Sequence, residues 1–109
     1  MSKRTEQVES LIQQVLGDVF SRELEMPEGA LATITRIEVT PDLKTAKVFV
    51  SALPFEQSAQ VMNVIEKKKG SLQKELNSQL TMRSSPKLLF ILDEQLEKVA
   101  KIDELLRKE

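Results

Sequence analysis

The sequence predicts an α+β domain in which helices cover one face of a three-stranded sheet. Apolar residues recur at spacings of three and four in two long segments, which is typical of amphipathic helices. Other stretches are rich in β-branched residues or continuously apolar, as strands are. The predicted order is helix, strand, strand, a helix kinked at Gly70, strand, helix. The 109 residues are expected to form one domain.

The composition excludes several classes of protein. The formal net charge is -1, so nucleic-acid binding would need a local basic patch. The chain has neither histidine nor cysteine, which removes the usual general base, the thiol nucleophile and the nitrogen or sulfur metal ligands. We therefore expect no catalytic residue, metal or cofactor. No apolar run approaches the roughly 20 residues of a membrane span, so we expect a cytoplasmic protein that does not bind membranes.

The first half of the chain predicts a helix and a hairpin. An amphipathic helix is expected from Thr5 to about Leu24, and Met26–Gly29 is a turn. Strands are predicted at Leu31–Thr40 and Thr45–Ser51. The short polar connection Pro41–Lys44 makes them an antiparallel hairpin.

The apolar pattern differs between the two hairpin strands. In the first strand, Ile34 is out of phase with Ile37 and Val39, which indicates a bulge or burial of both faces. The second strand alternates cleanly, with Ala46, Val48 and Val50 on one face and Lys47, Phe49 and Ser51 on the other. One face of the sheet is thereby left for solvent or a partner.

The second half predicts a kinked helix followed by a strand. The helix begins near Glu56, is interrupted at Gly70, and resumes through Leu80. Pro86 requires the helix to end by about Arg83. One face of the second segment carries Leu72, Leu76 and Leu80, which we expect to pack on the apolar strand Lys87–Leu92.

A last amphipathic helix is predicted from about Glu94, with Asp93 placed to cap it. Its apolar residues are Leu96, Val99, Ala100, Ile102, Leu105 and Leu106. Because a long helix connects the second strand to the third, these two strands could be parallel.

Four blocks of residues carry a resemblance to a known family. The blocks are Thr33–Leu43, Ala46–Ser51, Gly70–Leu76 and Met82–Phe90. In this order and spacing the chain resembles ribosome-binding factor A over nearly its whole length. The resemblance implies a type II KH-like fold and a non-enzymatic factor, monomeric when free. It also implies binding to the small (30S) ribosomal subunit and its 16S-type rRNA during assembly, with a role in maturation of the rRNA 5′ region, in a bacterial cytosol or an organelle matrix.

The chain departs from the family pattern at two places. The family replaces the Gly-x-x-Gly phosphate loop of KH domains with Ala-x-Gly, and the matching positions here are Lys68-Lys69-Gly70. A lysine therefore stands where the family has a small residue, which raises the local positive charge. Met26-Pro27 replaces the Asp-Pro that often follows the family's first helix.

The kink is the candidate rRNA-binding site. Its residues are Lys67, Lys68, Lys69, Gly70, Ser71 and Lys74. If Gly70 breaks the hydrogen-bond ladder, the amides of Ser71, Leu72 and Gln73 are free to bind a phosphate. The alternative is an ordinary solvated lysine face. Secondary candidates are Arg36, Lys47 and Arg83. Base stacking is not expected, because Phe20, Phe49 and Phe90 lie in or next to apolar runs, where we expect them to pack in the core, and only Phe55 falls in a loop.

Two other functions remain open on the sequence. The open sheet face or an edge strand could make the chain a protein-interaction or dimerisation module. A magnesium-dependent enzyme could use Asp42 or Asp93. Both aspartates have good structural explanations, in a turn and at a helix start, so the enzyme ranks last.

Overall fold

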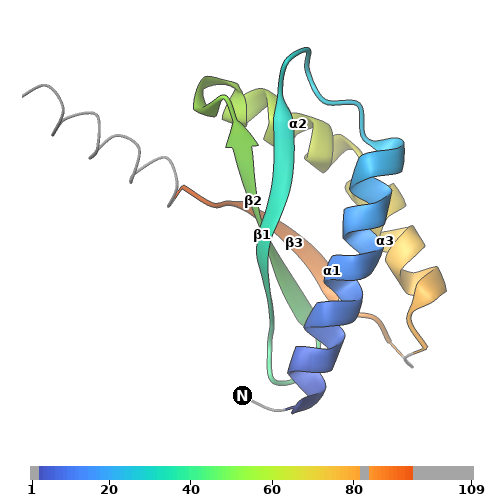
Figure 1. The fold of residues 1–109 in the computed structure, drawn as a ribbon. Coiled ribbons are helices and arrows are strands. Elements are labelled where there is room, and N and C mark those ends of the chain that lie inside the picture. The colour runs from blue at the N-terminus through green and yellow to red at the C-terminus, as the bar shows by residue number, and fades with distance from the viewer. Residues whose placement is uncertain (1–2, 82–83, 95–109) are drawn as a thin grey trace, which may run out of the picture.

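The computed structural model describes residues 3–81 and 84–94, and its elements follow the predicted order (Figure 1). They are α1 (Lys3–Glu23), β1 (Leu31–Val39), β2 (Thr45–Leu53), the short 3₁₀ helix η1 (Phe55–Gln57), α2 (Ser58–Lys67), α3 (Lys69–Gln79) and β3 (Lys87–Leu92). The predicted last helix lies outside the described residues. The second strand runs two residues further than predicted, and α2 begins two residues later because η1 precedes it.

The sheet has the order β1-β2-β3. β1 and β2 are antiparallel, and β2 and β3 are parallel, as the long helical connection suggested. The register of the hairpin shifts between Ile34 and Arg36, which confirms the bulge. The extra residue, Thr35, reverses the phase of the strand, so that Ile34, Ile37 and Val39 all face the helices.

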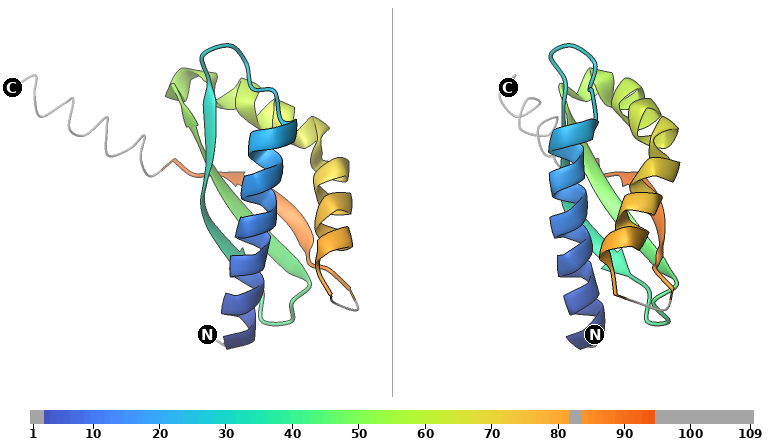
Figure 2. Two further views of the ribbon diagram at one scale, coloured as in Figure 1. Left: turned by 45° about the vertical axis from the view of Figure 1, so that its right-hand side comes forward. Right: turned by 90° about the vertical axis from the view of Figure 1, so that its right-hand side faces the viewer.

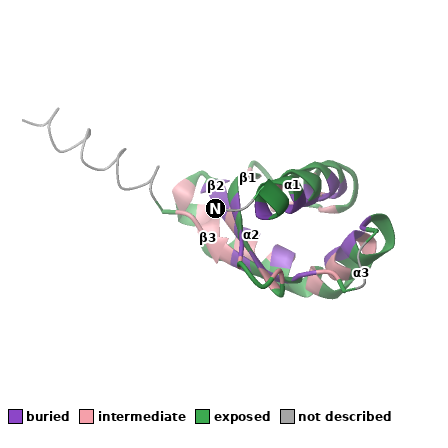
Figure 3. Ribbon diagram, turned by 90° about the horizontal axis from the view of Figure 1, so that it is seen from below, coloured by how far each residue is buried: buried purple, intermediate pink, exposed green. Residues whose placement is uncertain are grey.

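The helices lie on one side of the sheet and enclose the core with it. In the view from below, α1 and α3 lie on the same side of the strands and turn their buried faces inward (Figure 3). Ile12, Leu16 and Val19 of α1 are fully buried, as are Val48 and Val50 of β2. Burial of such side chains stabilises the fold by about 1.5–3 kcal/mol each.

α3 packs against α1 as well as against β3. Leu72, Leu76 and Leu80 are buried, as their spacing predicted, and α3 contacts both β3 and α1. The two helices run side by side in both views of Figure 2. The leucine row therefore closes the core between α1 and the sheet instead of resting on β3 alone.

Each of the two turns has one residue in the left-handed conformation, Gly29 in the first and Leu43, with a φ of 61°, in the hairpin loop. Gly29 has a φ of 79°, a left-handed conformation that glycine adopts without strain. In the hairpin loop, the Leu43 amide donates to the Thr40 carbonyl at 2.8 Å. The Asp42 carboxylate accepts from the Thr40 hydroxyl at 2.6 Å and from the Lys44 amide at 3.0 Å. Asp42 thus has the turn role expected from the sequence.

Candidate nucleic-acid interface

The break between the two helices lies at Lys68, two residues before the predicted kink at Gly70. Lys68 has φ -98° and ψ 4°, and its amide is shared between the carbonyls of Val64 at 3.2 Å and Ile65 at 3.1 Å. Its own carbonyl accepts from the Leu72 amide at 2.9 Å, which starts α3. Any residue type can adopt this conformation, so the break did not need a glycine.

Gly70 itself lies in the first turn of α3, and its φ is not positive. A methyl group added at Gly70 would meet nothing within 4 Å. The absent side chain therefore serves neither the backbone conformation nor packing against the described residues. It leaves the backbone of the first turn open to solvent.

The free amides also move with the break. Sequence reasoning placed them at Ser71, Leu72 and Gln73, but the Leu72 amide is bonded to Lys68. Within the described residues, the amides without a backbone acceptor at this helix start are those of Lys69, Gly70 and Ser71. The N-terminus of α3 therefore presents its positive dipole end beside Lys69 and Gly70.

The three consecutive lysines do not share one environment. Lys67 and Lys68 border a depression that also contains Glu23 and Glu25, from the end of α1 and the residues after it. Lys69, which is half-buried, borders a different hollow. The acidic neighbours lower the positive potential around the first two lysines, whereas Lys69 has no such neighbour among the described residues of its hollow.

The hollow beside Lys69 has a volume of about 620 Å³. Its lining is polar or basic and, among the described residues, contains no carboxylate: Lys69, Gly70, Gln73, Asn77, Ser84, Ser85 and Lys87. We call this site the Lys69–Lys87 hollow. Two cations, hydroxyl and amide groups, and a helix N-terminus are the donors that suit a phosphate group.

Gln73 fixes the floor of the Lys69–Lys87 hollow. Its side-chain oxygen accepts from the Leu88 amide at 2.8 Å, and its side-chain nitrogen donates to the Pro86 carbonyl at 3.0 Å. The same nitrogen also donates to Asn77 at 3.1 Å. These bonds attach α3, which carries Lys69, to the start of β3, which carries Lys87, and so keep both lysines in the lining of one hollow.

The other predicted site residues lie apart from the hollow or at its margin. Lys74 and Ser71 are exposed on α3, and Lys74 stands one turn beyond Gly70. Arg36 and Lys47 lie on the sheet face opposite the helices, so the structure does not bring them together with the lysine run. Arg83 lies outside the described residues.

Arg36 already has two partners on that face. Its guanidinium lies 4.0 Å from the centre of the Phe49 ring and 3.1 Å from the Glu38 carboxylate. Phe49 was predicted to pack in the core and instead is half-buried on the open face, because the strand alternation turns it away from the helices. Phe90 and Phe20 do pack in or against the core, with ring centres 6.3 Å apart.

Two residues of the hollow were missed by sequence reasoning. Lys87 was assigned only to the strand, and Gln73 only to a row of helix-start amides. The available signal was the spacing of Lys69, Gln73 and Asn77, which places three polar side chains on one helix face. Their meeting with Ser84, Ser85 and Lys87 depends on how α3 and β3 pack.

Neither a metal cluster nor a membrane span is found in the part of the chain that the structure describes. In the ranges 3–81 and 84–94, no three acidic, histidine or cysteine side chains come together as metal ligands would. Nor does any helix in these ranges combine the length and the hydrophobicity needed to cross a bilayer.

Comparison with known proteins identifies the family. The family model for ribosome-binding factor A matches residues 4–106. Ribosome-binding factor A of Roseiflexus castenholzii is 40% identical over 110 residues, which cover 99% of this chain and 85% of that protein. This chain belongs to the ribosome-binding factor A family. The resemblance noted from the sequence is thereby confirmed.

Solved structures agree with the KH-like fold of the ribosome-binding factor A family. A Thermotoga maritima protein described as a candidate ribosome-binding factor A superposes with a TM-score of 0.70 and 26% identity, covering 89% of this chain and 93% of its own. Thermus thermophilus ribosome-binding factor A, as a homology model fitted into a cryo-EM map of its 30S complex, superposes with a TM-score of 0.58 and 18% identity, covering 86% and 96%.

Proposed function

We propose that this protein binds the small ribosomal subunit during its assembly and contacts 16S-type rRNA through the Lys69–Lys87 hollow. Family membership supports the ribosomal partner, as does the 30S complex of the Thermus thermophilus relative. The observation that carries the site is the hollow itself, where two lysines and the α3 N-terminus meet without a carboxylate among the described lining residues. Phosphates of structured rRNA fit this donor set.

Recognition through the hollow depends on phosphates and on RNA shape. The four phenylalanines offer no stacking platform in the hollow, because none of them is among its described lining residues. Lys67 and Lys68 contribute less than Lys69, because Glu23 and Glu25 lie beside them. Lys74, Ser71 and Gly70 stand at the margin, and Arg83 remains a candidate on sequence grounds alone.

The biological role that follows is that of a non-enzymatic factor, monomeric when free, in the bacterial cytosol or an organelle matrix. The protein assists late maturation of the rRNA 5′ region by occupying the immature particle rather than by chemistry of its own. The absence of histidine and cysteine from the sequence supports a role without catalysis.

The test is co-sedimentation with immature and mature small subunits across a salt series. The variant Lys69→Ala/Lys87→Ala is compared with Lys67→Ala/Lys68→Ala and with Lys3→Ala/Arg4→Ala, which removes two exposed charges at the start of α1. We expect the first variant to weaken binding by tenfold or more, the second less, and the third hardly at all. The slope of log affinity against log salt should fall by roughly 0.7–0.9 for each phosphate that the variant no longer neutralises.

Two outcomes would reject the proposal. Equal losses for all three double variants would mean that only net charge matters, and the hollow would not be the site. No saturable binding by folded wild-type protein to either particle would remove the ribosomal partner itself. Gly70→Ala adds a check on backbone approach, because the added methyl group meets none of the described residues within 4 Å, so we expect any loss of binding to come from the ligand side.

A further inference from the structure

The sheet face opposite the helices carries an apolar surface that no described helix covers. Strand register places Phe49 beside Ile91, Lys47 beside Leu89, and Leu31 beside Leu53 at one end. Leu31, Leu53 and Leu89 are 67%, 46% and 42% exposed. We call this surface the open sheet face. Phe49 lies between the leucines at the two ends of this face, and the Arg36 guanidinium lies 4.0 Å from its ring. Exposed leucines on a face that no described helix covers are typical of a surface that meets another apolar element.

The chain leaves β3 toward the open sheet face. After the last β3 pair, Leu92 with Val50, the Asp93 amide still donates to the Val50 carbonyl at 2.7 Å. The Asp93 carboxylate then accepts from the Thr35 hydroxyl at 2.6 Å, although Thr35 belongs to β1 on the far side of β2. Because α1 and α2 occupy the other face of these two strands, the Asp93 side chain reaches across β2 on the open face, and the chain ends its described part beside that face (Figure 1).

The segment that follows has the chemistry to cover this surface. Residues 95–109 lie outside the described residues, and their sequence places apolar side chains at spacings of three and four: Leu96, Val99, Ile102 and Leu106. As a helix the segment would be about 22 Å long. A nine-residue strand such as β1 is about 30 Å long, so the segment fits within the sheet.

We propose that residues 95–109 pack across the open sheet face and bury its apolar surface. The occupant is this chain's own segment because it starts beside the surface, at Asp93. A tethered segment competes at an effective concentration on the order of millimolar, well above that of a free partner of the same chemistry. The apolar row then lies over Leu89 and Ile91, beside the Phe49 ring and its Arg36 partner, while the charged residues of the segment face water.

Engineered disulfides test the proposal cleanly, because the chain has no cysteine of its own. Leu89→Cys is combined in turn with cysteine at Leu96, Val99, Ile102 or Leu106, and in a second set at Glu97, Lys101, Glu104 or Lys108. The matched control places the first cysteine at Leu11, a leucine on α1 that is 48% exposed, similar to Leu89. A disulfide forms only where the Cα atoms can approach to about 4.4–6.8 Å.

We expect Leu89→Cys to form a disulfide within one chain at one or more of the apolar positions, at least tenfold faster than at the charged positions. Leu11→Cys should form none at a comparable rate. Equal rates at apolar and charged positions, or with Leu11→Cys, would overturn the proposal. Disulfides formed only between chains would also overturn it, and would assign the open sheet face to a second copy of the protein.

A second measurement needs no disulfide. Changing Leu96, Val99, Ile102 and Leu106 to serine should expose the open sheet face, raise binding of a hydrophobic dye several-fold and lower the melting temperature. The control changes Glu97, Lys101, Glu104 and Lys108 to serine and should do neither. Circular dichroism checks that the sheet and α1 remain folded. Identical dye binding and melting in both folded variants would count against the proposal.

Discussion

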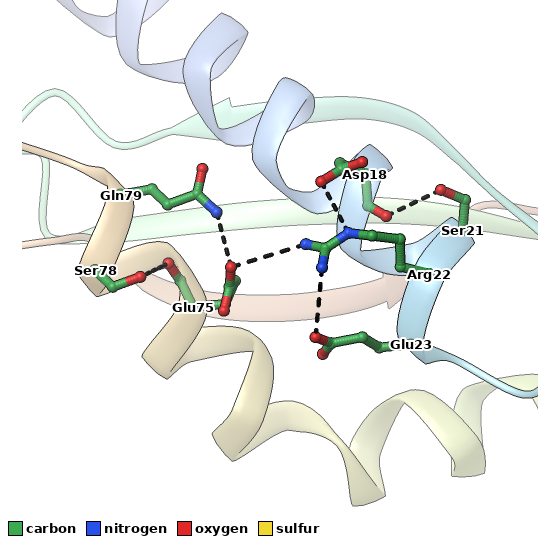
Figure 4. A network of polar contacts seen from close by, with 7 residues as sticks. All are labelled: Asp18, Ser21, Arg22, Glu23, Glu75, Ser78 and Gln79. Atoms are coloured by element: carbon green, nitrogen blue, oxygen red, sulfur yellow. Dashed lines mark hydrogen bonds and ion pairs between the residues drawn. The ribbon is translucent and has the colours of Figure 1, made fainter.

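Besides its buried leucine row, α3 is attached to β3 and to α1 by opposite kinds of polar contact. Toward β3, the neutral amide of Gln73 bonds to the backbone of Pro86 and Leu88, and both of those residues are fully buried. Toward α1, Glu75 meets Arg22 at 3.8 Å within an exposed network that includes Asp18 and Glu23 (Figure 4).

Charge is therefore a poor guide to which contact holds a helix in place. Exposed ion pairs lose most of their Coulomb energy to solvent and salt. An amide bonded to the backbone of buried residues matters more, because its loss leaves a backbone donor and a backbone acceptor without these partners. Among the polar contacts of α3, those of Gln73 should therefore contribute most to the placement of the Lys69–Lys87 hollow.

The largest expected effect is that of Gln73→Ala. It removes the partners of the Leu88 amide and the Pro86 carbonyl, so the free energy of unfolding should fall by about 1–3 kcal/mol. Urea denaturation measures this, and Gln79→Ala is the matched control, since Gln79 is an exposed glutamine on the same helix whose side chain bonds only to Glu75 among the described residues. Equal destabilisation by the two variants would contradict the larger role assigned to Gln73.

A smaller effect is expected for Arg22→Ala. The side chain is 50% exposed and its three ion pairs are all on the surface, so the loss of stability should be about 0.2–1 kcal/mol. The loss should shrink further in 1 M salt, where the screening length is about 3 Å. Denaturation at low and high salt checks this, and a loss above that of Gln73→Ala at either salt would contradict the comparison.

The smallest effect is the pH dependence of the Asp42 turn. Hydrogen bonds from the Thr40 hydroxyl and the Lys44 amide hold the pKa of Asp42 below its ordinary value of 3.8. A lowered folded-state pKa adds stability above the unfolded value, and that stability is lost as pH falls through the folded value. Wild type should exceed Asp42→Asn slightly at pH 7, and the difference should vanish in acid. Denaturation of both proteins between pH 7 and pH 3 measures this difference in stability. A difference that grows as pH falls would mean that the turn raises the pKa of Asp42 instead of lowering it.

The sequence predicted most of the described fold, because periodicity reports directly on which face of an element is buried. The alternation of Ala46, Val48 and Val50 and the phase change at Ile34 indicated the strands and the bulge. The kink was predicted two residues late, since glycine is a strong signal for a break and Lys68 adopts one without any special residue type.

The candidate site was predicted only in part. Lys69 and Gly70 were found because they stand in a charged run beside a helix start, and that signal is local. Lys87 was missed, and Lys67 and Lys68 were predicted to contribute to binding as much as Lys69. Both errors arise because the neighbours of these lysines come from other parts of the chain. Glu23 and Glu25 approach the lysine run only when α1 packs along the helix pair.

By itself the sequence determined the element order, the composition of the core and the family to which the chain belongs. These properties depend on residues near one another along the chain, or on the pattern of the chain as a whole. Only the tertiary structure decided which lysines share a hollow, which glutamine fixes it, and which face of the sheet stays open. These properties depend on distances between residues far apart in sequence, and those distances are set by how the helices and strands pack.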